Sequence, residues 1–211
     1  MRLRQNKGGK RRGHRMGFRR PLRSGFEQLE VRHLLAASVL INEIHYDPDI
    51  KTEAVSFVEL YNDGDQTADL SGCQLADAIV YAIPNGTGLA AQSYLVVSED
   101  PTVTQTKFGV ASLGPFQAKL NNDGETVVPR DASGVTRDEV DYQLGFPWPT
   151  VGDAPGYSIE LIHPSLENDI GGNWRSGGPT PGAINSVWAE QSPPQVRKVI
   201  HSPQFPSGWM M

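Results

Sequence analysis

From Val39 onward, short runs of alternating apolar and polar residues are separated by clusters rich in Gly, Asn and Asp. Alternation with a period of two predicts β-strands, and the clusters between the runs are typical of tight turns. Many short strands at this spacing predict an all-β sandwich or barrel. The expected strands are residues 39–46, 56–62, 74–83, 93–99, 116–121, 125–131, 136–143 and 157–164.

Three local patterns refine this picture. The stretch KLNNDGETVV predicts a hairpin in which Asn122, Asp123 and Gly124 supply positive-φ positions. Residues 101–109 predict a short helix that Asp100 caps and Pro101 begins. Pro129 cannot donate a ladder hydrogen bond, so we expect an edge or a bulge there.

Helix-period segments are too short for a βαβ unit, and neither GxGxxG nor GxxxxGK is present. Rossmann and P-loop nucleotide sites are therefore excluded as interpretations of this sequence. There is also no GxSxG elbow, and the single cysteine, Cys73, is expected to be a small core residue.

Charge is distributed unevenly along the 211 residues. Residues 1–25 carry ten Lys or Arg and no acid, which leaves nine basic against 24 acidic residues and a net charge of −15 in the remainder. We expect the basic arm to be disordered. It could contact phosphate or lipid, or begin an export signal, but the acidic remainder argues against nucleic-acid binding by the folded part. The apolar run 34–41 is too short to span a membrane.

The stretch FEQLEVRHLLAAS, residues 26–38, resembles the L-E-x-R-x-L-L segment near the N-terminus of many large bacterial surface and exported proteins. Val31 stands where that segment usually has Pro or Asp. The resemblance implies export or surface display. A short helical turn leading into the fold is the alternative.

From residue 39 to about 185, the order and spacing of several phrases resemble the lamin tail domain of bacterial exported proteins. These phrases include VLINEIHYDPD, SFVELYNDGDQTADLSGCQLAD, GYSIELIHPSLENDIGGNWR and GPTPGAIN. The resemblance implies an immunoglobulin-like β-sandwich. Cys73 departs from the family's Leu-Ser-Gly-Trp phrase, so neighbouring side chains must fill the space of the missing Trp. We expect Trp174 to pack against the sandwich and Arg175 to be free to pair with a carboxylate.

Candidate chemistry centres on the first expected strand. There, alternation places Glu43, His45 and Asp47 on one face with Val39 and Ile41, and Glu160 and His163 could join them from a later strand. A metal-dependent hydrolase would use His45, Asp47, Asp49 and His163. Because Pro48 ends the strand, we predict instead that Glu43 and His45 bond to neighbouring turns and that Asp47-Pro48-Asp49 forms an Asx-type turn. The acidic turns DPD, NDGD, NNDGE and END could also offer oxygen ligands to calcium.

The sequence as a whole predicts a non-catalytic binding or structural module of an exported or cell-surface bacterial protein, with a protein or glycan partner. We expect no catalytic residues, no metal ligands and no cofactor, and the binding residues are unknown. The main alternative is an accessory domain of a larger enzyme, such as a CotH-type kinase protein, whose catalytic region is absent here. The expected organisation is a disordered basic arm (1–25), the L-E-x-R-x-L-L segment (26–38), a lamin-tail sandwich (39–187) and a linker or stub (188–211) that could begin a truncated further module.

Overall fold

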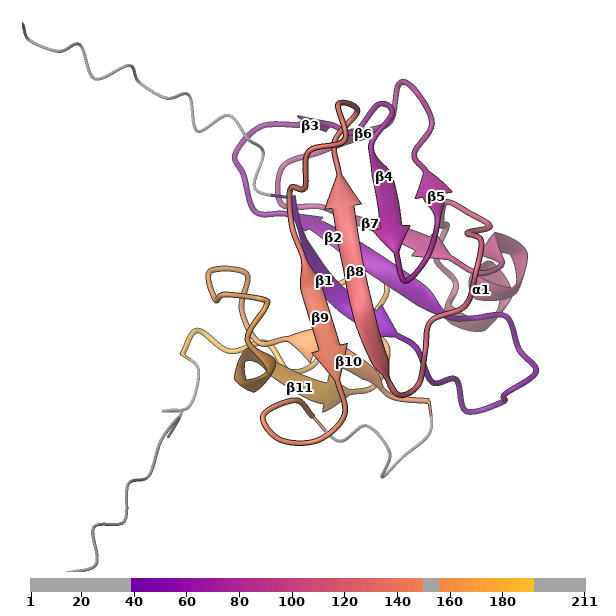
Figure 1. The fold of residues 1–211 in the computed structure, drawn as a ribbon, viewed down its shortest axis with the longest axis vertical. Coiled ribbons are helices and arrows are strands. Elements are labelled where there is room, and N and C mark those ends of the chain that lie inside the picture. Colours follow the sequence, from indigo (N-terminus) through magenta and orange to yellow (C-terminus); the bar gives the residue numbers. More distant parts are fainter. Residues whose placement is uncertain (1–38, 150–155, 192–211) are drawn as a thin grey trace, which may run out of the picture. The chain divides into compact units, whose positions relative to one another are not determined.

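Eleven strands and one short α-helix form the part of the chain that the computed structural model describes, residues 39–149 and 156–191 (Figure 1). All sheet pairings are antiparallel. One sheet has the strand order β11-β10-β1-β2-β7, a second has the order β5-β4-β8-β9, and β3 pairs with β6. The elements are β1 (Val39–His45), β2 (Phe57–Asn62), β3 (Ala68–Asp69), β4 (Gln74–Asp77), β5 (Tyr81–Ala82), β6 (Gly88–Leu89), β7 (Tyr94–Ser98), α1 (Pro101–Phe108), β8 (Gly124–Arg130), β9 (Val140–Gln143), β10 (Ser158–Leu161), η2 (Gly171–Asn173) and β11 (Trp174–Gly177).

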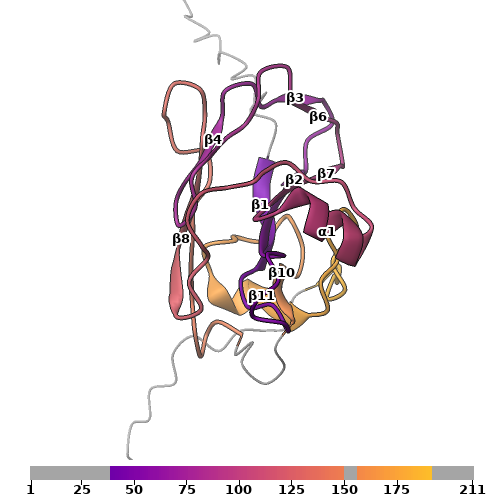
Figure 2. The ribbon, with the colours of Figure 1, turned by 90° about the vertical axis from the view of Figure 1, so that its right-hand side faces the viewer.

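The two larger sheets pack face to face, and Figure 2 shows them nearly edge-on as two layers. The core between them is a single cluster of buried apolar side chains. The five-stranded sheet contributes Ile44, Val58, Val97 and Ile159, and the four-stranded sheet contributes Leu75, Val127, Val140 and Tyr142. The predicted all-β, immunoglobulin-like sandwich is therefore confirmed. The predicted basic arm, the 26–38 segment and the stub beyond residue 191 lie outside the described residues.

A β-bulge in β1 overturns the expected face sharing. Ile41 pairs with Leu60 and Glu43 pairs with Glu59, so two steps along β1 match one step along β2, with Asn42 as the extra residue. As a result Ile41 and Ile44, three positions apart, both join the core. The prediction that Glu43 shares a face with Ile41 is wrong, because simple alternation takes no account of a bulge.

Several predicted strands are shorter or absent. The run 74–83 divides into β4 and β5 at Asp77, whose φ is 70°. Residues 116–121 form no strand: Ala118 has a φ of 72°, and only Gln117 bridges, to Val80. The predicted hairpin is therefore wrong, although Gly124 does have a positive φ of 102°. A Cβ at Gly124 would lie 2.6 Å from the carbonyl oxygen of Tyr142. Strands β3, β6 and β11 were not predicted.

Pro129 lies within an inner strand, because β8 is flanked by β4 and β9. Pairing with β9 covers only Gly124 to Val127, however, so Pro129 lies beyond its end. The Pro129 carbonyl accepts from Arg137 N at 2.9 Å, and the N and C=O of one strand residue point to the same side. The backbone nitrogen of Pro129, which has no hydrogen to donate, therefore points toward the turn after β8 and not toward β4. At Pro129, this side of β8 is locally an edge.

The region around Trp174 and Cys73 follows the sequence prediction in part. Trp174 is fully buried, as expected. Arg175 pairs with no carboxylate among the described residues; its guanidinium donates to the carbonyl oxygens of Gly172 and Trp174. Cys73 is only partly buried, at the margin of the core, and burial raises the pKa of its thiol.

Helix α1 forms as predicted, with Asp100 at its N-cap. The Asp100 carboxylate accepts from Thr102 N at 2.8 Å and from Val103 N at 3.2 Å, and Gly109 ends the helix at a φ of 73°. These contacts satisfy backbone donors that a helix leaves without an internal partner.

We expect the substitution Asp100→Ala to lower the free energy of unfolding by about 1 kcal/mol, since an N-cap of this kind contributes about that much. Urea denaturation of the two proteins measures the difference. Asp65→Ala is the matched control, because Asp65 is an exposed loop aspartate. An equal loss for the two substitutions would contradict the capping role.

Candidate functional site

Three buried glutamates lie side by side across the five-stranded sheet. Glu43 in β1 is directly opposite Glu160 in β10 on one side and Glu59 in β2 on the other. All three are 0% exposed. We call these residues the glutamate row. Among the ion pairs of the described residues, none includes a member of the row.

The glutamate row faces away from the sandwich core. The next residues along the same three strands, Ile44, Val58 and Ile159, are paired in the same way and belong to the core cluster. Because successive strand residues point to opposite faces, the row lies on the outer face of the sheet. Carboxylates on the outer face of a sheet ordinarily contact water. Because these three are buried, another segment of the chain must cover them.

The cover is the segment that follows β11, residues 178–189, which we call the strap. Backbone N–H groups and hydroxyls of the strap donate to every carboxylate of the row. These bonds run from Thr180 N and Oγ1 to Glu43 (3.0–3.3 Å), from Gly182 N to Glu59 (2.5 Å), and from Ser186 Oγ and Val187 N to Glu160 (2.9–3.1 Å).

The bulge in β1 supplies a further anchor for the strap. Asn42, the extra residue of the bulge, donates to Glu59 Oε1 at 2.9 Å and to Asn185 Oδ1 at 2.8 Å. Asn185 in turn donates to the carbonyl oxygen of Leu161 at 2.8 Å. The bulge thereby aims a side-chain amide at both the row and the strap, which is a common use of bulges.

Two glycines allow the strap to approach so closely. Gly182 has a φ of 78°, and a Cβ there would lie 2.7 Å from Val110 Cγ2. At Gly177, just before the strap, a Cβ would overlap Glu160 Oε1 and Ser186 Oγ. Both positions therefore require glycine for steric reasons.

Burial dominates the electrostatics of the row. It raises the pKa of Glu43 to about 7, and it raises the pKa of Glu59 to about 8, with the charge of Glu43 adding to the effect. Burial also raises the pKa of Glu160, while hydrogen bonds from the strap act in the opposite direction. The row can therefore hold protons at neutral pH. Because it is fully covered, it cannot reach a substrate while the strap is in place.

His45, the strongest candidate ligand, is enclosed in aromatic side chains. Its ring stacks on Phe57 at 5.3 Å and meets the edge of Phe108 at 5.9 Å, and Nδ1 lies 3.2 Å from Ser158 Oγ. Nε2 is buried without a hydrogen-bond partner among the described residues. Burial lowers the pKa of His45 to about 4, so the ring is neutral at physiological pH.

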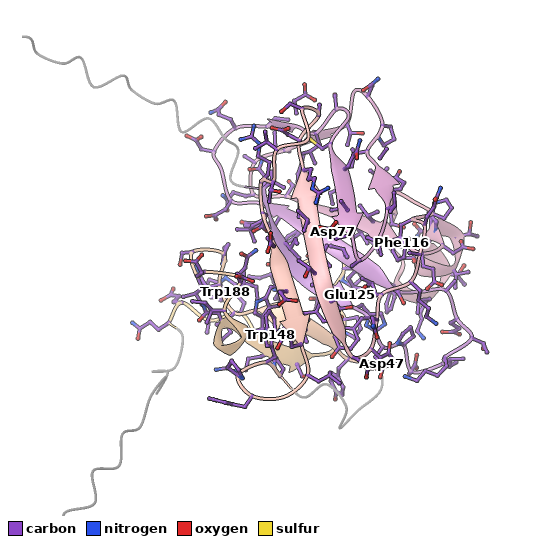
Figure 3. All side chains as sticks on the ribbon, viewed as in Figure 1. Asp47, Asp77, Phe116, Glu125, Trp148 and Trp188 are labelled. Carbon is purple, nitrogen blue, oxygen red and sulfur yellow. The ribbon has the colours of Figure 1, made fainter. Side chains whose placement is uncertain are left out.

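The other candidate ligands lie elsewhere. His163 packs on Trp188 at 5.6 Å and lies beyond the end of β10, whereas His45 contacts Ser158 at the start of β10. Asp47 and Trp188 lie on opposite sides of the molecule in Figure 3. The structure does not bring His45, Asp47, Asp49 and His163 together. Among residues 39–149 and 156–191, no three His, Cys, Asp or Glu are placed to hold a metal ion.

Asp47 and Asp49 are engaged on the surface instead. Asp47 pairs with Lys51 and accepts from Asn122 Nδ2 at 2.6 Å, and Asp49 pairs with Lys107. Asp49 also accepts from Ile50 N at 3.0 Å. The predicted Asx-type turn around Pro48 is thus replaced by contacts to Lys51 and to the turn before β8. The prediction that Glu43 and His45 bond to neighbouring turns is wrong: Glu43 accepts from Thr180 of the strap and His45 contacts Ser158 of β10, both more than 100 positions away in the chain.

Sequence reasoning identified Glu43 and Glu160 but missed Glu59, Asn42 and the strap donors. One signal was available. In each of the stretches NEI, VEL and IEL, a glutamate stands directly before an aliphatic residue, within a run of mostly apolar residues. A glutamate repeated in the middle of buried strands indicates an internal carboxylate with dedicated hydrogen-bond donors.

Comparison with known proteins places this architecture in a family. Within the part of the chain that the structure describes, no helix is long and apolar enough to cross a membrane. No curated protein matches the chain. The family model described as Lamin Tail Domain matches residues 35–143, more than half of the chain and the part that contains β1 to β9. The chain therefore belongs to the lamin tail domain family.

Proposed function

We propose that the chain is a non-catalytic binding or structural module of an exported or cell-surface bacterial protein, with a protein or glycan partner. The observation that carries the proposal is that the acidic side chains and the histidine of the candidate site are already engaged by other parts of the chain. Glu43, Glu59 and Glu160 hold the chain's own strap, and His45 is enclosed by Phe57 and Phe108. Family membership also favours an immunoglobulin-like structural domain.

Export is supported by sequence alone. The ten basic residues before residue 26 and the L-E-x-R-x-L-L resemblance at 26–38 are typical of leaders of surface proteins. The acidic character of the remainder suits a solvated exterior domain and disfavours binding to nucleic acid.

Fractionation of the native host, with mass spectrometry of the mature N-terminus, tests the location. We expect the protein in the extracellular or surface fraction. Recovery of uncleaved protein that begins with Met1, only in the cytosol, would overturn the export part of the proposal.

A parallel experiment tests the non-catalytic part. The purified full chain is screened for binding on glycan arrays and by cross-linking on intact cells, and for hydrolysis of ester, phosphoester and peptide substrates with and without divalent cations. We expect binding and no turnover. Cation-dependent hydrolysis by the purified chain that is lost in His45→Ala, in His163→Ala or in both would establish an enzyme instead.

A further inference from the structure

The strap is held to the sheet mainly by carboxylates rather than by a backbone ladder. Its N–H groups at Thr180, Gly182 and Val187 all end on the glutamate row. A backbone bond from Ala189 N to Ile162 O, at 3.1 Å, joins its far end to the segment after β10. Asn185 adds bonds to Asn42 and to the carbonyl oxygen of Leu161, and the rest of the strap's attachment depends on the state of three acidic side chains.

Apolar burial adds little to this attachment. Ile184 is 55% exposed and Trp188 is 41% exposed, and Asn185 is the one buried residue of the strap. The core row of Ile44, Val58 and Ile159 packs on the other face of the sheet and does not depend on the strap. Loss of the strap would thus leave the packing between the two sheets intact.

The geometry of the row opposes full ionisation. Residues directly opposite in antiparallel strands have Cβ atoms about 5 Å apart, and like charges in such positions are destabilising. Glu43 has a glutamate opposite it on both sides. With the strap in place water is excluded, so the repulsion is poorly screened.

No described neighbour supplies a compensating cation. Arg175 of β11 is opposite Glu160, but its guanidinium donates to the carbonyl oxygens of Gly172 and Trp174. Tyr61 of β2, Tyr94 of β7 and His45 of β1 are further titratable groups on this face. Burial raises the pKa of both tyrosines, that of Tyr94 to about 12, and lowers the pKa of His45 to about 4, so none of the three supplies a charge. Lys107 of α1 pairs with Asp49 and Glu53, and the strap itself carries no titratable side chain.

We propose that the glutamate row is a pH-sensitive latch, which holds the strap closed over the sheet while it carries protons and releases the strap when its carboxylates ionise. On release the protons pass to solvent, the three carboxylates become hydrated, and the sandwich stays folded. The strap is the C-terminal part of the domain, so release would detach that part from the sheet and expose the glutamate row to water.

The direction follows from the geometry of the row: three adjacent carboxylates without a cation repel one another more strongly under the strap than in water, and the raised pKa values agree with this. Carboxyls whose pKa is higher when covered than when hydrated favour the covered state at low pH and the hydrated state at high pH. The strap is therefore closed at pH 6, and its opening is favoured as the pH rises above 8.

Amide hydrogen exchange by NMR on the full chain tests the latch. After correction for the intrinsic exchange rate at each pH, we expect the protection of Thr180, Gly182 and Val187 to fall at least ~tenfold between pH 6 and pH 8.5. The protection of Val127 and Val140, paired in the other sheet, should fall far less. Equal loss for both sets would mean global unfolding, and unchanged strap protection would mean no latch; either result overturns the proposal.

Glu43→Gln sharpens the test, since it removes the central charge and keeps the size and one carbonyl acceptor for Thr180 N. The Thr180 hydroxyl can reorient to accept from the new amide. We expect the pH dependence of strap protection to shrink severalfold in this variant. Glu125→Gln, in a carboxylate that accepts from Tyr142 on the other sheet, is the matched control and should behave as the unaltered protein does. If Glu43→Gln does not fold, the comparison of the two amide sets in the unaltered protein decides alone.

Discussion

Replacing Trp174 with alanine is expected to lower the free energy of unfolding by about 4 kcal/mol. Trp174 is the largest of the fully buried side chains. Its ring lies 6.0 Å from that of Trp148, and its indole N–H donates to the carbonyl oxygen of Asn168 at 2.6 Å. The substitution would leave a large cavity and a carbonyl without its donor, and both effects destabilise the folded state.

Chemical denaturation with the full chain measures this loss, and two variants make it specific. Trp174→Phe keeps most of the ring volume but removes the N–H, so an intermediate loss is expected. Trp188→Ala removes an indole that is 41% exposed and should cost much less. Similar losses for Trp174→Ala and Trp188→Ala would show that Trp174 does not carry the packing at this end of the sheet.

Raising the pH from 5.5 to 8.5 is expected to lower the free energy of unfolding by about 3 kcal/mol or more. The pKa of Glu43 is about 7 and that of Glu59 about 8 in the folded protein, against 4.5 for an ordinary glutamate. The folded state therefore holds protons that the unfolded state has lost, so stability falls as the pH passes through these values. A pKa shift of one unit corresponds to about 1.4 kcal/mol, so two such groups suffice.

Other buried groups change the size of this pH dependence of the free energy of unfolding without reversing its direction. Burial also raises the pKa of Glu160 and Asp138, which adds to the loss at high pH. His45, with a pKa of about 4 when folded, acts in the opposite direction, but only below its ordinary value of 6.5. Above pH 6.5 the opposing contribution of His45 fades, so the steepest fall is expected from there to about pH 8.

Urea denaturation at pH 5.5, 7.0 and 8.5 measures this dependence. If the strap opens before the sandwich unfolds, the loss should level off once the carboxylates are hydrated. A free energy of unfolding that is constant or that rises across this range would contradict the assignment of protons to the glutamate row.

The outline of the fold was predictable because its strands carry strong local signals. Glu59 lies in a run whose alternation and length mark β2, and Asp100 with Pro101 marks α1. The bulge at Asn42 was not predictable, since it depends on pairing with β2 and on the contact to Asn185. Similarly, residues 116–121 have a strand-like composition, but Ala118 adopts a positive φ.

The residue types of the candidate site could be predicted from the sequence, but the partners of those residues could not. Alternation put Glu43 and His45 on one face, and that neighbourhood is real. Thr180 bonds to Glu43 and Gly182 bonds to Glu59 across more than 100 positions of the chain, and local pattern gives no signal for such contacts. Ligand-like residue types near one another therefore suggested a metal centre, whereas their partners are the chain's own amides.

The central place of β1 in its sheet has a consequence for the order in which the domain can be made. Glu43 and its partner Glu160 are 117 positions apart, so at about 5–20 residues per second the ribosome needs roughly 6 to 25 s to deliver β10 after β1. During that time one edge of β1, next to Ile41 and Ile44, has no strand to pair with, and open edges of this kind promote association between chains. The five-stranded sheet can be completed only after nearly the whole domain has been synthesised, so a nascent chain needs protection from its neighbours until then.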